Sequence, residues 1–438
     1  MSAEALAAAL FVLVVAGIIL RIIDESVTGL VGLILMIVLT KYTPLEAFHK
    51  IDWNVIAILL GMWIITGYMI EGGFAELVVD AVAKRIRSYR LFLLTMVILA
   101  GFVSILVDNV LVILLFGTIV IEAARKTRAD PVLAILLVGF AANFMGTALL
   151  MGDLPPQLLH SVAGAEFLDF IWSHGRPSSF PLLSITFLLV VAIMYRLFIS
   201  KEPENIVSIE SRELEKKINK PVLLISITGF TATIIGMAIR PLLGVPLGFI
   251  TMSGAAFTAL AAELHNKIGN RGVSVEEALN HVEWRALLFY ASLFGLVGGL
   301  EANGVLEDAA RHLIGFLSVG PFVAYTVFYW VVAGLATIVE HDALLLTFLY
   351  LVRDAAKIAG INAWPLYWGM AWSATLASNM TVAAAPALYV AISMAEKAGY
   401  HVKPRTFFKY SVPFVISSLV IQYLITLPLW APLLRLAS

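Results

Sequence analysis

The fold class of this chain can be inferred from residues 104 to 118, which read S-I-L-V-D-N-V-L-V-I-L-L-F-G-T. Asp108 and Asn109 stand side by side in the middle of this almost wholly apolar run. A carboxylate at bilayer depth costs about 3 kcal/mol on insertion scales, so a chain that keeps one there generally gives it a polar path to line. We therefore predict that Asp108 lies on a route for ions or small polar solutes through a membrane.

A second interrupted apolar run follows at residues 141 to 156, which read A-A-N-F-M-G-T-A-L-L-M-G-D-L-P-P. It places Asn143, Thr147 and Asp153 among apolar residues. Proline removes a backbone donor, so the Pro155-Pro156 pair interrupts a helix. Asp153 either caps the helix that follows or is an ordinary loop residue at the membrane edge. We predict that this run and the first one line half of the route.

The composition is that of a membrane protein. Only 13% of the 438 residues are charged and 61% are hydrophobic, whereas about 25% of a soluble domain is charged. Repeated apolar stretches predict an all-α polytopic membrane protein with about ten to twelve transmembrane helices. The apolar stretches predict a lipid bilayer as partner, and the net charge of −1 gives no indication of nucleic acid. The absence of cysteine excludes disulfides and thiolate metal sites.

The order of polar features repeats along the chain. Residues 201–220 form a hydrophilic linker between a first membrane half, 1–200, and a second, 221–438. Asp108-Asn109 in the first half matches the Glu340–Asp342 cluster in the second, at a nearly constant offset. A duplicated membrane half is typical of transporters with internal repeats.

Two further pairs keep this offset. Asp52-Trp53 matches Glu283-Trp284, and Ala142-Asn143 matches Ser378-Asn379. Together with the acidic cluster, these pairs predict that equivalent features of two repeats meet at one site.

Glu340, His341 and Asp342 are candidates for ion binding. At membrane depth they must pair, protonate or line water. An imidazole with an intrinsic pKa of about 6.5 suits a proton-coupled step. The alternative is that the cluster marks a short loop at the membrane surface, and its match to Asp108-Asn109 favours the buried position.

Amides and hydroxyls beside small residues are candidates for solute binding. The residues concerned are Asn143, Thr147, Ser378, Asn379 and Thr381. Unwound backbone at such places adds carbonyls and helix N-termini as ligands. The same residue types also form hydrogen bonds between packed helices, and the sequence leaves both roles open.

These motifs resemble the ion transporter superfamily, which holds arsenite permeases, sodium/proton antiporters, silicon efflux carriers, the pink-eyed dilution protein and dicarboxylate/sodium symporters. The resemblance rests on S-x-x-x-D-N-V from Ser104, on A-N-x-x-G-T with G-D-x-P-P at 142–156, and on the echo at 340–381. It implies two inverted repeats, each with a re-entrant hairpin and a broken helix, a homodimer, and secondary transport. Dicarboxylate members carry Ser-Asn-Thr in both halves, which Phe144 and Met380 interrupt here.

The sequence therefore favours a plasma-membrane secondary transporter that exports a small ion, arsenite or another metalloid oxyanion or Na⁺, in exchange for H⁺. The alternative is Na⁺-coupled uptake of a carboxylate such as citrate or succinate. We expect no cofactor beyond H⁺ or Na⁺ as coupling ion, and no metal other than Na⁺ at Asp108. An enzyme is not expected, because Leu150 breaks the G-x-G-D pattern of intramembrane proteases and H-E-x-x-H is absent. The sequence contains no phosphate-binding loop motif, which argues against an ATP-driven pump in this chain.

Overall fold

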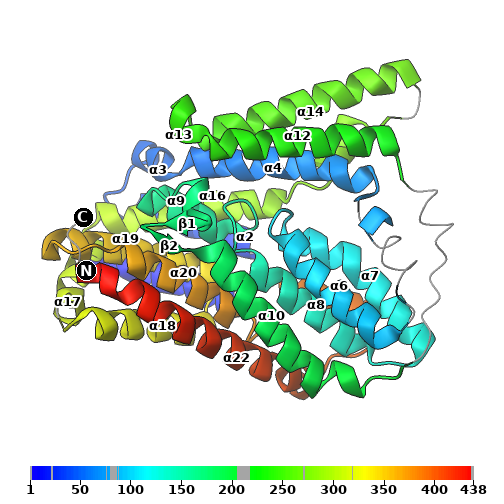
Figure 1. Cartoon of the computed structure of the whole chain (residues 1–438). Coiled ribbons are helices and arrows are strands. Elements are labelled where there is room, and N and C mark those ends of the chain that lie inside the picture. The colour runs from blue at the N-terminus through cyan, green and yellow to red at the C-terminus, as the bar shows by residue number, and fades with distance from the viewer. Residues whose placement is uncertain are drawn as a thin grey trace.

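A computed structural model gives the structure of the chain and describes residues 2–20, 23–74, 76–78, 86, 88–204, 218–269, 272–317 and 319–435 (Figure 1). Within these ranges the first half contains α1 (Ala3–Leu20), α2 (Glu25–Leu39), α3 (Pro44–Lys50), α4 (Trp53–Glu71), α6 (Tyr89–Ser104), α7 (Asn109–Thr127), α8 (Pro131–Met145), α9 (Leu154–Ala163), η1 (Phe167–Phe170), α10 (Ser179–Leu197) and η2 (Ile199–Lys201). The antiparallel strands β1 (Trp172–Ser173) and β2 (Arg176–Pro177) form one short hairpin.

The second half is built from the same kinds of elements. They are α12 (Lys220–Ala238), α13 (Arg240–Leu243), α14 (Leu247–Gly269), α15 (Val275–Leu279), α16 (Trp284–Ala302), α17 (Val305–Leu317), α18 (Pro321–Ala336), α19 (His341–Ala359), α20 (Trp364–Ser378), α21 (Pro386–Lys397), α22 (Pro404–Trp430) and η3 (Ala431–Arg435). Residues 205–217 of the predicted linker lie outside the described residues.

Seven of the described helices are long and apolar enough to cross a membrane: α1, α4, α10, α12, α14, α16 and α22. Four shorter apolar helices are α2, α6, α8 and α18. The apolar windows of α1 and α12 are only 22% and 33% buried, so these helices direct apolar side chains outward, as lipid-facing helices do. The predicted all-α multi-pass membrane protein is confirmed. The expectation of ten to twelve crossings counted every apolar run as a span, but several of these runs form short helices.

A helical hairpin and an interrupted helix follow one another in the first half. The hairpin consists of α6 and α7, and α7 begins where the Asp108 carboxylate accepts a hydrogen bond from the Val110 amide at 2.9 Å. Arg128 ends α7 in the left-handed conformation, with φ 58°. Asp130 then caps α8, which begins with Pro131.

The interruption between α8 and α9 depends on close backbone contact. A Cβ on Gly152 would lie 2.4 Å from the carbonyl oxygen of Gly146 and 2.8 Å from that of Ser104. Only glycine fits where the interruption crosses the hairpin turn so closely. The Ser104–Gly152 contact thereby fixes the hairpin turn against the interrupted helix.

The second half repeats this arrangement. The hairpin of α18 and α19 turns at residues 337–340, and Glu340 caps α19 as Asp108 caps α7. An interrupted helix of α20 and α21 follows, with its break at residues 379–385. All of α8 is buried, as is α20 from Pro365 to Ser378, so these two helices lie at the centre of the molecule.

The two halves exchange contacts reciprocally. The short helix α9 packs on α19 and α20, while its counterpart α21 packs on α7 and α8. The outer helices do the same. Helices α1 and α2 pack on α16. Helices α12 and α14 pack on α4, which Figure 1 shows. Each half therefore completes the other, and both hairpins reach the same central region.

Candidate functional site

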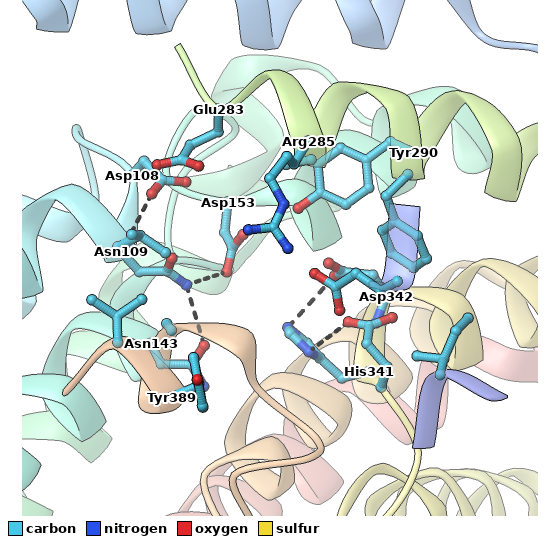
Figure 2. A pocket seen from close by; sticks show the side chains of 18 of the residues that line it. Asp108, Asn109, Asn143, Asp153, Glu283, Arg285, Tyr290, His341, Asp342 and Tyr389 are labelled. Atoms are coloured by element: carbon cyan, nitrogen blue, oxygen red, sulfur yellow. Dashed lines mark hydrogen bonds and ion pairs between the residues drawn. The ribbon is translucent and has the colours of Figure 1, made fainter. Parts of the chain in front are cut away.

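A cavity of about 540 Å³ lies where both hairpins and both interrupted helices meet. Its charged and polar lining consists of Asp24, Glu25, Asp108, Asn109, Asn143, Asp153, Glu283, Arg285, Tyr290, Glu340, His341, Asp342 and Tyr389 (Figure 2). The predicted polar residues of both hairpins thus share one chamber.

An amide network joins the first hairpin to the first interrupted helix. The Asn109 amide donates to the Asp153 carboxylate at 2.9 Å and to the Asn143 side-chain oxygen at 3.3 Å. Asp153 also accepts a hydrogen bond from the Leu154 amide at 2.8 Å. Of the two roles left open for Asp153, the structure selects the cap of a helix, and the residue is 7% exposed.

Two hydrogen bonds cross between the halves next to this network. The Asn143 amide donates to the Ser378 hydroxyl at 2.9 Å, and the hydroxyls of Thr147 and Thr375 lie 2.6 Å apart. All four side chains are buried. These bonds connect α8 and the residues after it directly to α20.

The second hairpin contributes a compact charged cluster. Glu340 accepts hydrogen bonds from the amides of Asp342, at 3.0 Å, and Ala343, at 2.8 Å. His341 Nδ1 lies 3.3 Å from a Glu340 oxygen, and Nε2 lies 3.5 Å from Asp342 Oδ1. Glu340 and His341 are each 2% exposed and Asp342 is 4% exposed, so the cluster is buried within the protein.

The N-terminal end of α16 completes the cavity with residues that the sequence analysis did not select. Glu283 directly precedes α16, and Figure 2 shows its carboxylate and that of Asp108 pointing toward one another. Arg285 forms an ion pair with Asp24 at the rim. The match of Asp52-Trp53 with Glu283-Trp284 was the one sequence signal that could have identified this end of the helix.

Five predicted site residues do not line the cavity: Ser104, Thr147, Ser378, Asn379 and Thr381. Ser378 and Thr147 form the bonds between the halves, and the Thr381 hydroxyl donates to the Thr337 carbonyl at 2.6 Å. The side-chain atoms of Ser104 and Asn379 are buried without hydrogen-bond partners among the described residues.

The sequence match of Asn143 with Asn379 does not agree with the positions of these residues relative to the ends of α8 and α20. Asn379 is the first residue after α20, and its counterpart after α8 is Gly146. Asn143 lies inside α8 and lines the cavity. The two asparagines therefore occupy different places in the two halves.

The charge of the lining determines what the cavity can hold. Carboxylates from five segments of the chain outnumber the two cationic side chains, Arg285 and His341. Ligand atoms of Glu340, His341 and Asp342 lie within 4.8 Å of one another, which is close enough to share one metal ion. Such a lining favours cations and protons over anions.

The sequence and fold are similar to those of known transporters. A family model described as a citrate transporter matches residues 11–373. An uncharacterised transporter of Mycobacterium tuberculosis is 27% identical over 419 residues, covering 93% of this chain and 94% of that protein.

Two solved structures share the fold. MtrF of Neisseria gonorrhoeae, described with a class of antimetabolite efflux pumps, has a TM-score of 0.60 and 12% identity over 98% of this chain and 95% of that one. The YdaH transporter of Alcanivorax borkumensis has a TM-score of 0.59 and 13% identity over 90% of this chain and 88% of that one. With the family match over most of its length, the chain is a multi-pass secondary transporter that belongs to the citrate transporter family.

Proposed function

We propose that this transporter exchanges protons for a small cation at the cavity, by alternating access. The observation that carries the proposal is the excess of carboxylates in the lining. Carboxylates and histidines inside membranes are typical of ion pathways and proton relays. In this scheme Asp108 and the Glu340–Asp342 cluster bind the coupling proton or the cation. Asn109, Asn143 and Asp153 form a hydrogen-bonded part of the cavity lining between these two groups.

The charge of the cavity lining favours one of the two exported ions that the sequence suggested, Na⁺, over the other, a metalloid oxyanion. A metalloid oxyanion would enter against several carboxylates and would find only Arg285 and His341 as cationic partners. A cation such as Na⁺ meets the opposite charge. We therefore place the cation ahead of the oxyanion.

Carboxylate uptake is the second candidate, and the description of the family favours it. A carboxylate such as citrate would add negative charge to an acidic cavity, so it would have to enter together with cations. Na⁺ would serve as that cation in a symport, with Arg285 as the first contact of the carboxylate. The two candidates share the site and differ in the solute that crosses with the coupling ion.

Alternating access further requires that the two halves move against each other. We propose that residues 1–200 and 221–438 are inverted repeats joined by the linker 201–220. The reciprocal packing of α9 and α21, and of the outer helices on α4 and α16, supports this proposal. Ser104, Thr147, Ser378, Asn379 and Thr381 would act outside the cavity by shaping the interruptions, and the protein would work as a homodimer.

Reconstituted protein tests these proposals. Proteoliposomes containing a pH-sensitive dye receive an imposed proton gradient, followed by Na⁺, Li⁺, arsenite, succinate or citrate in separate trials. We expect Na⁺ or Li⁺ to dissipate the gradient. Dissipation by arsenite alone would place the protein among metalloid exporters, and a response only to citrate or succinate with Na⁺ would establish the symporter.

A further inference from the structure

We propose that the contact between α4 and α9 is the closed gate of the cavity, and that a proton on His160 opens it. The proposal rests on the proposed function and deepens it, because alternating access requires one side of the cavity to be closed while the other is open. Three observations carry it: the two halves differ in exposure at equivalent positions, the hydrogen bond from Asn54 requires a neutral His160, and the second half has no equivalent histidine.

The cavity reaches the surface on the side of the second half. Arg285 on α16 lines it with 77% of its side chain exposed. Tyr389, the fourth residue of α21, also lines the cavity and is 58% exposed (Figure 2). The fourth residue of α9 is Gln157, which is 0% exposed. The same position of the interrupted helix is therefore open in one half and closed in the other.

The amide of Gln157 indicates that the closed side opens in another state. Both of its polar atoms are buried without hydrogen-bond partners among the residues that the structure describes. A buried amide without partners costs free energy, which water or a solute would offset once α9 separates from α4. Tyr389, its equivalent in the second half, already lines the cavity. We therefore expect Gln157 to line the cavity when the first half is open.

Asn54 holds α9 against two helices of the closed side. It is the second residue of α4, as Arg285 is of α16. Its side-chain oxygen accepts a hydrogen bond from the Gly248 amide of α14 at 2.8 Å, and its side-chain nitrogen lies 3.3 Å from His160 Nε2 on α9. A Cβ on Gly248 would lie 2.8 Å from the Asn54 carbonyl oxygen, so α14 and α4 are in backbone contact. The Asn54 side chain is thus fixed by α14 and holds His160 through its other end.

The bond between Asn54 and His160 requires a neutral imidazole. His160 Nδ1 lies 2.8 Å from the Ala165 carbonyl oxygen, which can only accept, so Nδ1 donates. The Gly248 amide can only donate, so Asn54 turns its oxygen to Gly248 and its NH₂ group to His160. Nε2 must therefore accept from Asn54 with its lone pair. A proton on Nε2 would place two donors against each other and break the bond between α9 and α4.

The charged groups around His160 do not replace this bond. On the elements around α9 they are Asp52 before α4, Glu166 and Arg240, which pair with each other, and His341, Asp342, Arg353, Asp354 and Lys357 on α19; α20 carries none. Asp52 already accepts hydrogen bonds from the amides of Asn54 and Val55 and from the Ser161 hydroxyl. Carboxylates and guanidinium groups generally keep their charge between about pH 5 and 8, whereas an imidazole changes its charge there. At the contact itself, His160 is therefore the group that introduces a dependence on pH.

The second half has no histidine at this place. Counted from the starts of α9 and α21, Ile392 is equivalent to His160. An isoleucine side chain neither accepts a hydrogen bond nor binds a proton. Protons therefore act on one side of the protein only, the side that is closed here. They open the cavity toward themselves, which is the direction that a proton needs in order to enter an exchanger.

Thiol labelling tests the inference, because the chain contains no cysteine. Gln157→Cys places a single thiol behind the closed gate, and Tyr389→Cys places it on the open side. Full-length protein in detergent is treated with a water-soluble methanethiosulfonate reagent between about pH 7.5 and about pH 5.5, where an imidazole gains most of its proton. Each rate for Gln157→Cys is divided by that for Tyr389→Cys, which corrects for the effect of pH on the thiol. Leu158→Cys, also at a position that is 0% exposed, is a second reporter if Gln157→Cys fails to fold.

We expect the ratio to rise about fivefold or more at the lower pH, since loss of one hydrogen bond changes an equilibrium by about that factor. With His160→Gln, which is neutral at both pH values and can accept from Asn54, the reporter should stay protected. With His401→Gln, a change at an exposed histidine, it should respond to pH as in the unaltered background.

A ratio that does not change with pH, or that rises equally with His160→Gln, would overturn the inference. If the gate fails this test while Na⁺ still dissipates a proton gradient, only the inference about the gate is lost. A pH-dependent gate without any coupled flux would instead overturn the proposed function.

Discussion

The hairpin and interrupted helix of the first half, α6 to α9, and those of the second, α18 to α21, use the same design with different chemistry. In both, an acid caps the second hairpin helix, and the next residue bonds to the interruption in the same half. Asn109 donates to Asp153, whereas His341 bonds to the backbone of Ala384. The first half therefore places a carboxylate on its interruption, and the second half places its charges on the hairpin.

This difference indicates that the two halves have different roles at the cavity. The interruption of the second half begins α21 after Ala385, which provides no side-chain cap, while Asp153 provides one for α9. The charges of the second half lie instead at Glu340, His341 and Asp342, next to a backbone carbonyl. We infer that the hairpin of the second half binds the cation and that the first half supplies the facing carboxylates.

The largest effect is expected at Asp108, where charge and helix cap coincide. Asparagine caps helices about as well as aspartate, so Asp108→Asn should preserve the start of α7. An amide neither exchanges a proton nor neutralises a cation, and we expect coupled flux to fall more than about tenfold, equivalent to about 1.4 kcal/mol. The measurement is dissipation of a proton gradient in proteoliposomes.

Asp52→Asn is the matched control for Asp108→Asn, because Asp52 caps α4 in the same way and does not line the cavity. Its coupled flux should remain close to that of the unaltered protein. Equal flux in both variants would remove Asp108 from the mechanism.

The next effect is expected at Gly152, which has no glycine counterpart in residues 379–385. Gly152→Ala would push a Cβ into two backbone carbonyls at 2.4 and 2.8 Å. Overpacking of this kind costs about 1–3 kcal/mol, so we expect a lower thermal unfolding temperature in detergent. Gly334→Ala is the control, since a Cβ there meets nothing within 4 Å. Unchanged melting of Gly152→Ala would mean that the interruption is free to move away from the hairpin.

The effect on stability at Asn109 should be no larger than that at Gly152, and it acts through hydrogen bonding rather than through packing. Asn109→Ala removes the side-chain amide that donates to the buried Asp153, which keeps the Leu154 backbone amide as a donor. Loss of one partner from a buried polar pair costs about 1–3 kcal/mol. A decrease in the unfolding temperature is expected, and a double variant with Asp153→Asn should show less than the sum of the two single losses. Strict additivity would indicate that the two side chains do not interact.

The sequence alone was enough to identify site residues that stand out as charged groups within apolar runs. Asp108 and the Glu340–Asp342 cluster interrupt apolar runs, and their match at a constant offset placed them at equivalent caps. Glu283 and Arg285 were missed because charges at the start of a helix are ordinary in a sequence. Only tertiary packing, which brings α16 against both hairpins, makes them part of the cavity.

Which polar residues face the cavity was harder to predict. Asn143 and Thr147 are four residues apart and would share a helical face, but α8 ends at Met145, so Thr147 turns toward Thr375. Residues 379–385 of the second interruption contain neither glycine nor proline, so the sequence does not show where α20 ends. Matching by residue type therefore paired Asn379 with Asn143. Helix ends, rather than residue types, give the correct register.

The smallest effect is expected at Asn379, and it sharpens the comparison with Asn109. Both amide atoms of Asn379 are buried without hydrogen-bond partners among the described residues, whereas the Asn109 amide has two. Asn379→Ala removes an unsatisfied polar group, which offsets the lost packing, so we expect the unfolding free energy to change by less than about 1 kcal/mol. Thermal unfolding is compared directly with Asn109→Ala, and coupled flux should stay within about twofold, a change of about 0.4 kcal/mol. Unchanged stability with a large loss of flux would show that this amide binds the transported ion in another state of the cycle, and would place Asn379 in the site that its sequence context first indicated.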